Sequence, residues 1–235
     1  MKGRYIFFAV ITIILPFVLA MGSVMLVFTP EFLQFEYRQP DFPEDPFGFT
    51  LEERMEYGTA SVDYITGILN RDPDAFLESL KMKDGSPLYN ERELSHMKDV
   101  RIVFQGCRAG MAAMIVFIIL TIWLVSKRPD SLMGLLHGIG RGSALTLILI
   151  AAVGIGIVTG FDAFFDSFHQ LFFNDGTWLF YESDSLIRLF PEKLWVDGFS
   201  LAAIFTGLMA FLLLLVSILA GKKVKIIQKK TGYRE

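Results

Sequence analysis

Four long apolar stretches constrain the fold of this 235-residue chain more than any other feature of its sequence. They cover residues 5–28, 109–126, 143–165 and 199–220. The hydrocarbon core of a bilayer is about 30 Å thick, and a helix crosses it with about 20 residues. Backbone N–H and C=O groups cannot stay unpaired in lipid, so such stretches must be helical. With 53% hydrophobic residues in the chain, we predict an all-α integral membrane protein with four transmembrane helices.

The first stretch could instead be a cleaved signal peptide, because the small residues of "LAMGS" (19–23) lie near its end. The apolar core of a signal peptide is usually about 7 to 15 residues long. The run here is longer, at about 24 residues. We therefore expect the first helix to be retained as a membrane span.

Basic residues flank the spans unevenly, and short cytoplasmic loops are those enriched in Lys and Arg. The basic residues are Lys2 and Arg4, then Lys127, Arg128 and Arg141, then Lys222, Lys223, Lys225, Lys229, Lys230 and Arg234. This pattern predicts cytoplasmic termini, a cytoplasmic loop at 127–142 and a basic cytoplasmic tail at 221–235. Residues 29–108 then form an extracytoplasmic cap and 166–198 a shorter extracytoplasmic, interfacial segment, and together these hold most of the acidic residues.

The larger outward segment carries helix-start signals, which predict a mainly helical cap. Thr50 is followed three residues later by Glu53, and Asn90 by Glu93, each ahead of apolar residues at helical spacing. This arrangement is the capping box, in which side chains satisfy the free N–H groups of the first turn. Cys107 is the single cysteine, so no intramolecular disulfide can stabilise the cap.

Three histidines stand out in a chain with 23 phenylalanines. The predicted topology places His96 and His169 on the outer side, just beyond the second and third spans, and His137 on the cytoplasmic side. Histidine is the side chain whose ordinary pKa lies nearest neutrality, and it commonly serves as a general acid or base. A surface histidine and an interfacial polar side chain are the plainer interpretations of His96 and His169 taken singly.

Other polar residues could support this histidine pair. Carboxylates stand one helical turn away, Glu93 and Asp99 beside His96 and Asp166 beside His169. Arg188 and Trp178, in the second outward segment, could hold an oxyanion or a substrate, although lipid-headgroup contacts are common for both residue types at an interface.

Several catalytic motifs are missing from the sequence. It contains neither HExxH nor CxxC, so no metal is expected, and no GxSxG elbow for a serine nucleophile. From the residues alone, a histidine-based membrane enzyme and a non-enzymatic sensor or assembly factor both stay open.

Three motifs resemble those of the lipoprotein intramolecular transacylase (Lit) family of Gram-positive bacteria. They are "ELSHMKDVRIVF" before the second span, "FDSFHQLFFNDGTWLF" after the third and "LIRLFPEKLW" before the fourth. The resemblance extends over the whole chain in the number of spans and the order of the motifs.

The resemblance implies a multi-pass enzyme of the bacterial cell membrane, with its active site on the outer face. The implied reaction moves the sn-2 acyl chain of a diacylglyceryl lipoprotein to the α-amine of its own N-terminal Cys. His96 and His169 would be the catalytic pair. We expect His169 to be the base because it lies nearer the lipid, and the reverse assignment of the two roles stays open. We expect Arg188, Trp178, Asp99 and Asp166 to contact substrate. Membrane lipids are the other expected partners, and neither a cofactor nor nucleic acid is expected. A lipid or lipoprotein esterase with the same histidines is the nearest alternative.

Overall fold

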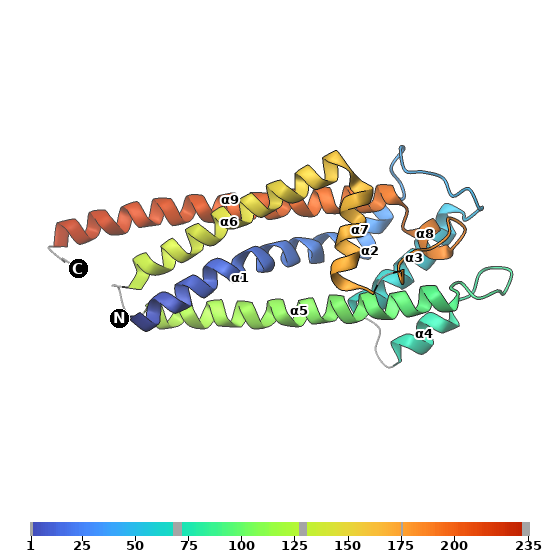
Figure 1. Ribbon diagram of the computed structural model, residues 1–235, viewed down its shortest axis with the longest axis horizontal. Helices are drawn as coiled ribbons and strands as arrows, with labels where there is room; N and C mark the ends of the chain where they lie inside the picture. Colours follow the sequence, from blue (N-terminus) through green and yellow to red (C-terminus); the bar gives the residue numbers. More distant parts are fainter. Residues whose placement is uncertain (1, 68–71, 127–130, 175, 232–235) are drawn as a thin grey trace. The chain divides into compact units, whose positions relative to one another are not determined.

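The computed structural model describes residues 2–67, 72–126, 131–174 and 176–231. The helices, labelled in Figure 1, are α1 (Lys2–Val27), α2 (Pro30–Glu36), α3 (Leu51–Thr66), α4 (Pro73–Ser79), α5 (Glu91–Ser126), α6 (Leu132–Thr159), α7 (Phe161–Phe172), α8 (Ser185–Leu189) and α9 (Glu192–Thr231). Over these ranges the extended structure consists of a single bridge between Lys81 and Pro87. The all-α prediction is therefore confirmed.

The chain divides into two compact units. The bundle unit comprises Met1–Val24, Ala109–Ile155 and Ala202–Glu235, and the cap unit comprises Met25–Arg108 and Gly156–Leu201. Among the described residues, four helices are long and apolar enough to cross a membrane, namely α1, α5, α6 and α9. The predicted number of transmembrane helices is confirmed.

Glycines of α6 allow a close approach of α1 within the bundle unit. A Cβ atom on Gly138 would lie 2.8 Å from the carbonyl oxygen of Phe8, and one on Gly142 would lie 3.0 Å from Leu15. Thr12 adds a hydrogen bond from its hydroxyl to the carbonyl of Gly138 (3.1 Å). Because lipid provides no hydrophobic force between helices, close packing of small residues and such hydrogen bonds hold them together.

The ends of α6 differ from the expected ranges. The predicted cytoplasmic loop 127–142 is helical from Leu132 onward, and residues 127–130 lie outside the described residues. The predicted third span, 143–165, ends early, because α6 stops at Thr159 and α7 begins after Gly160. Glycine is a poor helix former. The nearby Gly156 also leaves room for the ring of Phe164, which a Cβ atom would meet at 3.2 Å.

The cap unit has its own hydrophobic core. Its fully buried members include Tyr64 of α3, Leu77 of α4, Met97 of α5 and Leu189 of α8. Both predicted capping boxes are present. Thr50 and Glu53 exchange their two hydrogen bonds at the start of α3, and Asn90 and Glu93 do the same at the start of α5. The cap is mainly helical, as predicted.

Three side chains of α5 bind the C-terminal end of α3. Arg101, Gln105 and Arg108, which are spaced to share one face of α5, donate to the carbonyl oxygens of Tyr64, Ile65 and Thr66 respectively. The last carbonyls of a helix have no partner within it. These contacts satisfy them and fix α3 against the part of α5 that follows His96.

Candidate active site

His96 and His169 lie close together within the cap unit. His96 is in the second turn of α5 and His169 is near the end of α7. Their ring centroids are 6.1 Å apart, the ring planes are inclined by 22°, and the residues are 6% and 7% exposed. The structure thus brings together the two histidines that the sequence singled out, and it holds them away from bulk water. His137 is exposed on α6, in the bundle unit.

Aromatic side chains surround both rings. Phe173 and Phe180 contact His96 edge-on, with centroid distances of 5.0 and 5.4 Å. The ring centroids of Phe165 and Trp178 lie 4.0 Å and 5.8 Å, respectively, from that of His169. The aromatic residues come from α7 and from the chain that follows it, so the motif containing His169 provides most of its own surroundings.

A backbone contact fixes the proton arrangement of His169. Its Nδ1 lies 2.9 Å from the carbonyl oxygen of Phe165, one turn earlier in α7. A carbonyl oxygen can only accept a hydrogen bond, so Nδ1 carries the proton in the neutral ring and Nε2 keeps the free lone pair. Burial lowers the pKa of His169, while the Phe165 carbonyl and the charge of Asp166 act in the opposite direction. The lowered pKa favours the neutral form of the ring, with its lone pair on Nε2.

Two buried nitrogen atoms at the site lack a hydrogen-bond partner among the described residues. They are Nδ1 of His96 and Nε1 of Trp178. A buried polar group without a partner costs about 1–3 kcal/mol. Trp178 Nε1 is necessarily a donor. Both atoms are suited to bind a polar group of a substrate that enters the site.

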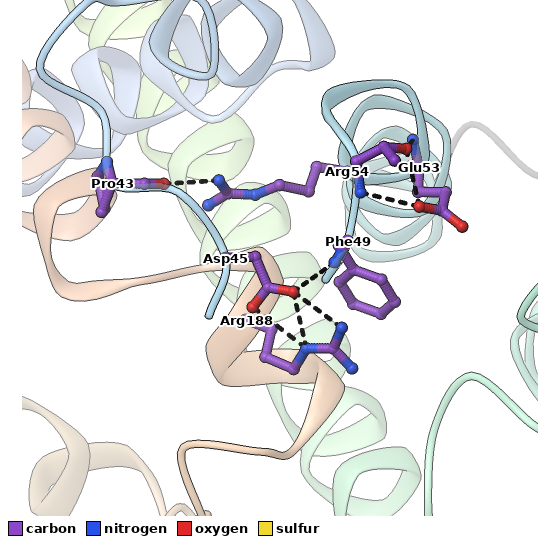
Figure 2. A network of polar contacts seen from close by, with 7 residues as sticks. Pro43, Asp45, Phe49, Glu53, Arg54 and Arg188 are labelled. Atoms are coloured by element: carbon purple, nitrogen blue, oxygen red, sulfur yellow. Dashed lines mark hydrogen bonds and ion pairs between the residues drawn. The ribbon is translucent and has the colours of Figure 1, made fainter. Parts of the chain in front are cut away.

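Arg188 is bound within the protein. Its guanidinium makes a forked contact with Asp45, with Nη2 2.8 Å and Nε 3.2 Å from Oδ2 (Figure 2), and the side chains are 10% and 0% exposed. The guanidinium also lies 3.4 Å from the ring centroid of Phe49. Burial alone would raise the pKa of Asp45, but the hydrogen bonds from Arg188 and from the N–H of Phe49 outweigh it and lower that pKa. Arg188 thus fastens the loop before α3 to α8.

The three carboxylates predicted to support the histidine pair differ in their burial and in their partners. Asp166 is exposed on α7 and acts on His169 through its charge. Asp99 is half-buried on α5, and in the described structure no hydrogen bond joins it to His96. Glu93 is buried, and its two oxygens accept from the backbone N–H groups of Asn90 and Leu186.

Sequence reasoning did not identify Asp45, the partner of Arg188, or the contact between Glu93 and Leu186. The capping box identified Glu93 as a local helix-start residue, but nothing local reveals a contact with a residue so distant in the chain. In the described part of the chain, no three His, Cys, Asp or Glu side chains gather in a way that could hold a metal ion.

Comparison with known proteins identifies the family. The chain matches the family model described as "Lipoprotein intramolecular transacylase Lit" over residues 7–195. An uncharacterized protein of Aquifex aeolicus (strain VF5) is 28% identical over 216 residues, which cover 92% of this chain and 95% of that protein.

Solved structures share the fold. The in meso structure of the membrane integral lipoprotein intramolecular transacylase Lit from Bacillus cereus matches with a TM-score of 0.79 at 19% identity, covering 96% of this chain and 99% of that one. A structure of the same protein with a histidine-to-arginine mutation matches with a TM-score of 0.72 at 20% identity, over 97% and 96% of the two chains. Together with the four apolar helices, these matches identify a multi-pass membrane protein.

Proposed function

Because the chain belongs to the lipoprotein intramolecular transacylase (Lit) family of acyltransferases, we propose that it moves the sn-2 acyl chain of a diacylglyceryl lipoprotein to the α-amine of the N-terminal Cys, using His169 and His96. The observation that carries this proposal is the pair of buried rings 6.1 Å apart, contributed by α5 and α7. The product would be a lyso-form lipoprotein, with one acyl chain on nitrogen and one on the glyceryl group.

The reaction needs one proton to move between two atoms of the same substrate. The α-amine attacks the sn-2 ester carbonyl, and a C–N bond forms as the carbonyl oxygen takes on negative charge. The bond from the carbonyl carbon to the glyceryl oxygen then breaks, and the proton lost by the amine ends on that oxygen as a hydroxyl. Neither an oxidant nor a second substrate is required.

His169 is the proposed base. With Nδ1 bound to the carbonyl of Phe165, Nε2 is free to take the proton of the attacking amine. The resulting imidazolium can give this proton to the departing glyceryl oxygen, so one ring serves as base and then as acid. An α-amine has a pKa of about 8, which leaves part of it neutral and nucleophilic near pH 7.

His96 and Trp178 are the proposed groups that bind the charged oxygen of the transition state. Each has a buried ring nitrogen without a partner in the described structure, and a neutral His96 can carry its proton on that nitrogen. Donors fixed in place before the reaction stabilise developing charge, and removal of one such donor typically costs about 100- to 1,000-fold in rate. The surrounding aromatic rings keep water away and make this stabilisation stronger.

The remaining predicted residues receive less direct roles. Asp166 increases the basicity of His169 through its charge. Arg188 is already paired with Asp45, and we propose that it acts by fastening α8 rather than by touching substrate. A contact between Asp99 and the substrate stays a prediction.

The proposed orientation follows from the basic flanks of the spans. Both termini would be cytoplasmic, and the cap unit with its histidines would face the outer side of the bacterial cell membrane. Lipoproteins carry their diacylglyceryl group in that membrane, so the outer face is where the ester and the amine would meet the enzyme.

Analysis of the product tests the proposed reaction. The protein would be expressed in a bacterium whose own lipoproteins are diacylated, and the N-terminal lipopeptides would be identified by mass spectrometry. We expect peptides that carry an N-acyl chain and an S-monoacylglyceryl group. Loss of an acyl chain without N-acylation would instead identify a hydrolase that uses water as acceptor, and unchanged lipopeptides would contradict both reactions.

A further inference from the structure

Glu93 is a buried carboxylate that joins two segments of the cap unit that are far apart in the sequence. It lies one turn before His96 and is 2% exposed. Oε2 accepts from the backbone N–H of Asn90 (2.8 Å), and Oε1 accepts from the backbone N–H of Leu186 (2.7 Å). Leu186 is in the first turn of α8. One carboxylate therefore satisfies unpaired N–H groups at the start of two helices.

Two neighbours of Glu93 bind the chain just before α8. Arg92 and Asn90 donate to the two carboxylate oxygens of Asp184, each at 3.1 Å. The guanidinium of Arg92 also lies 5.0 Å from the ring centroid of Tyr181. Arg92 is exposed, and ion pairs at exposed positions contribute little. Glu93 is the fully buried member of this group, so its hydrogen bond with the N–H of Leu186 is the one best shielded from water.

The chain held in this way, residues 181–186, directly follows the aromatic side chains that touch the histidine pair. Trp178 contacts His169 and Phe180 contacts His96. We propose that Glu93 is a positioning residue of the transacylase, which acts through Leu186 to hold Trp178 and Phe180 against the two histidines. This inference rests on the proposed function.

The helix start of α5 alone does not require this contact. The side chain of Asn90 already accepts from the N–H groups of Arg92 and Glu93. Without Glu93, the buried N–H of Leu186 would lose its partner, and the chain before it would be held to α5 only by the contacts of Asp184 with Asn90 and Arg92. A displacement of about 1 Å at a reacting centre can cost about 100-fold in rate.

Glu93→Gln tests the contact with little change in size. An amide offers one oxygen as acceptor, and its NH₂ group would face one of the two backbone donors. Glu53→Gln is the matched control, because Glu53 completes the same capping box at the start of α3 and binds Thr50 and Lys83 instead. Both changes weaken a helix start, but only the first affects the chain beside the histidines.

The full-length protein in lipid nanodiscs would be assayed with a synthetic diacylglyceryl lipopeptide, and hydrogen exchange would be followed by mass spectrometry in peptides covering residues 176–190. We expect Glu93→Gln to lower kcat at least about tenfold, to leave KM within about twofold and to speed exchange in these peptides. Glu53→Gln should change none of the three. A smaller loss of kcat, about two- to fivefold, is expected for Asp184→Asn, which serves if Glu93→Gln does not fold.

Wild-type kcat in Glu93→Gln, or in Asp184→Asn where that variant is used, would overturn the inference and leave the proposed function intact. A loss of kcat with unchanged exchange would also overturn it, because Glu93 would then act directly on substrate. Absence of N-acylated product from the wild-type protein would refute the proposed function itself.

Discussion

The histidine pair consists of two rings of the same kind in different polar surroundings. Nδ1 of His169 is bound to the carbonyl of Phe165, whereas Nδ1 of His96 has no partner among the described side chains and backbone groups. This asymmetry supports different roles for the two residues, one as base and one as donor. The sequence favoured His169 as the base only through its position nearer the lipid and left the reverse assignment open. The atoms that each ring nitrogen faces are visible only in three dimensions.

The pH dependence of the reaction tests the role of His169. Its pKa is lowered, so the neutral base persists to a lower pH than for an ordinary histidine, whose pKa is about 6.5. Asp166 acts against this lowering. We expect Asp166→Asn to lower the pKa further and so to raise the ratio of the rate at pH 5.5 to the rate at pH 7.5.

Asp162→Asn is the control. Asp162 lies one turn before Asp166 on α7, and it is therefore farther from His169 along the helix. The ratio of the two rates would be measured for both variants and the wild type under the same conditions. A lower ratio in Asp166→Asn than in the wild type would contradict the assignment of His169 as the base.

Helix ends and helix contacts mark the limit of what the sequence predicts at the scale of elements. The four apolar stretches and the two capping boxes were predicted, because each is a local pattern. The end of α6 at Thr159 was not predicted, because apolar residues continue beyond it with Phe164 and Phe165, which belong to α7. Contacts such as Arg188 with Asp45 join segments distant in the chain, so no local pattern reveals them.

The buried ion pair between Asp45 and Arg188 should contribute strongly to the stability of the cap unit. Asp45→Asn leaves the guanidinium of Arg188 buried without its charged partner, and loss of one member of a buried pair typically costs about 3–5 kcal/mol. We expect a clear fall in the thermal midpoint in detergent. Glu78→Gln, which removes an exposed partner of Lys98, should have little effect. Equal midpoints for the two variants would contradict this account of the pair.

The contact between α1 and α6 should be sensitive to the size of one residue. In Gly138→Ala the new methyl group would lie 2.8 Å from the backbone oxygen of Phe8, which cannot move as a side chain can. Such overpacking typically costs about 1–3 kcal/mol. Gly154→Ala is the matched control, because nothing lies within 4 Å of the added Cβ atom. Thermal unfolding in detergent should separate the two variants, and an unchanged midpoint in Gly138→Ala would refute the close contact.

The whole chain combines four apolar helices, each long enough to cross a membrane, with a helical cap unit that carries His96 and His169. The number of spans and the family are established, and the direction in which the chain crosses the membrane is a proposal based on its basic flanks. Hydropathy predicts spans well because lipid allows few alternatives to a helix. The meeting of α5 with α7 depends on packing in three dimensions, and the sequence could suggest it only through the topology.

Thiol labelling tests the proposed orientation. With Cys107 replaced by Ser, we expect a membrane-impermeant maleimide to label Lys81→Cys in right-side-out vesicles and to label Lys225→Cys only after the vesicles are opened. Both positions are exposed, one in the cap unit and one near the end of α9. Labelling of Lys225→Cys in sealed vesicles, with Lys81→Cys protected, would reverse the orientation.

We propose that His96 and His169 together carry out the acyl transfer. The initial rate of N-acyl, S-monoacylglyceryl product formation by purified variants in liposomes, measured by mass spectrometry, tests this proposal. We predict that His96→Gln and His169→Gln each lower this rate at least about 100-fold, because each removes a proton-transfer or oxyanion-binding group. His137→Gln, in the bundle unit, should stay within about twofold of the wild-type rate. A near-wild-type rate in either His96→Gln or His169→Gln would contradict the claim.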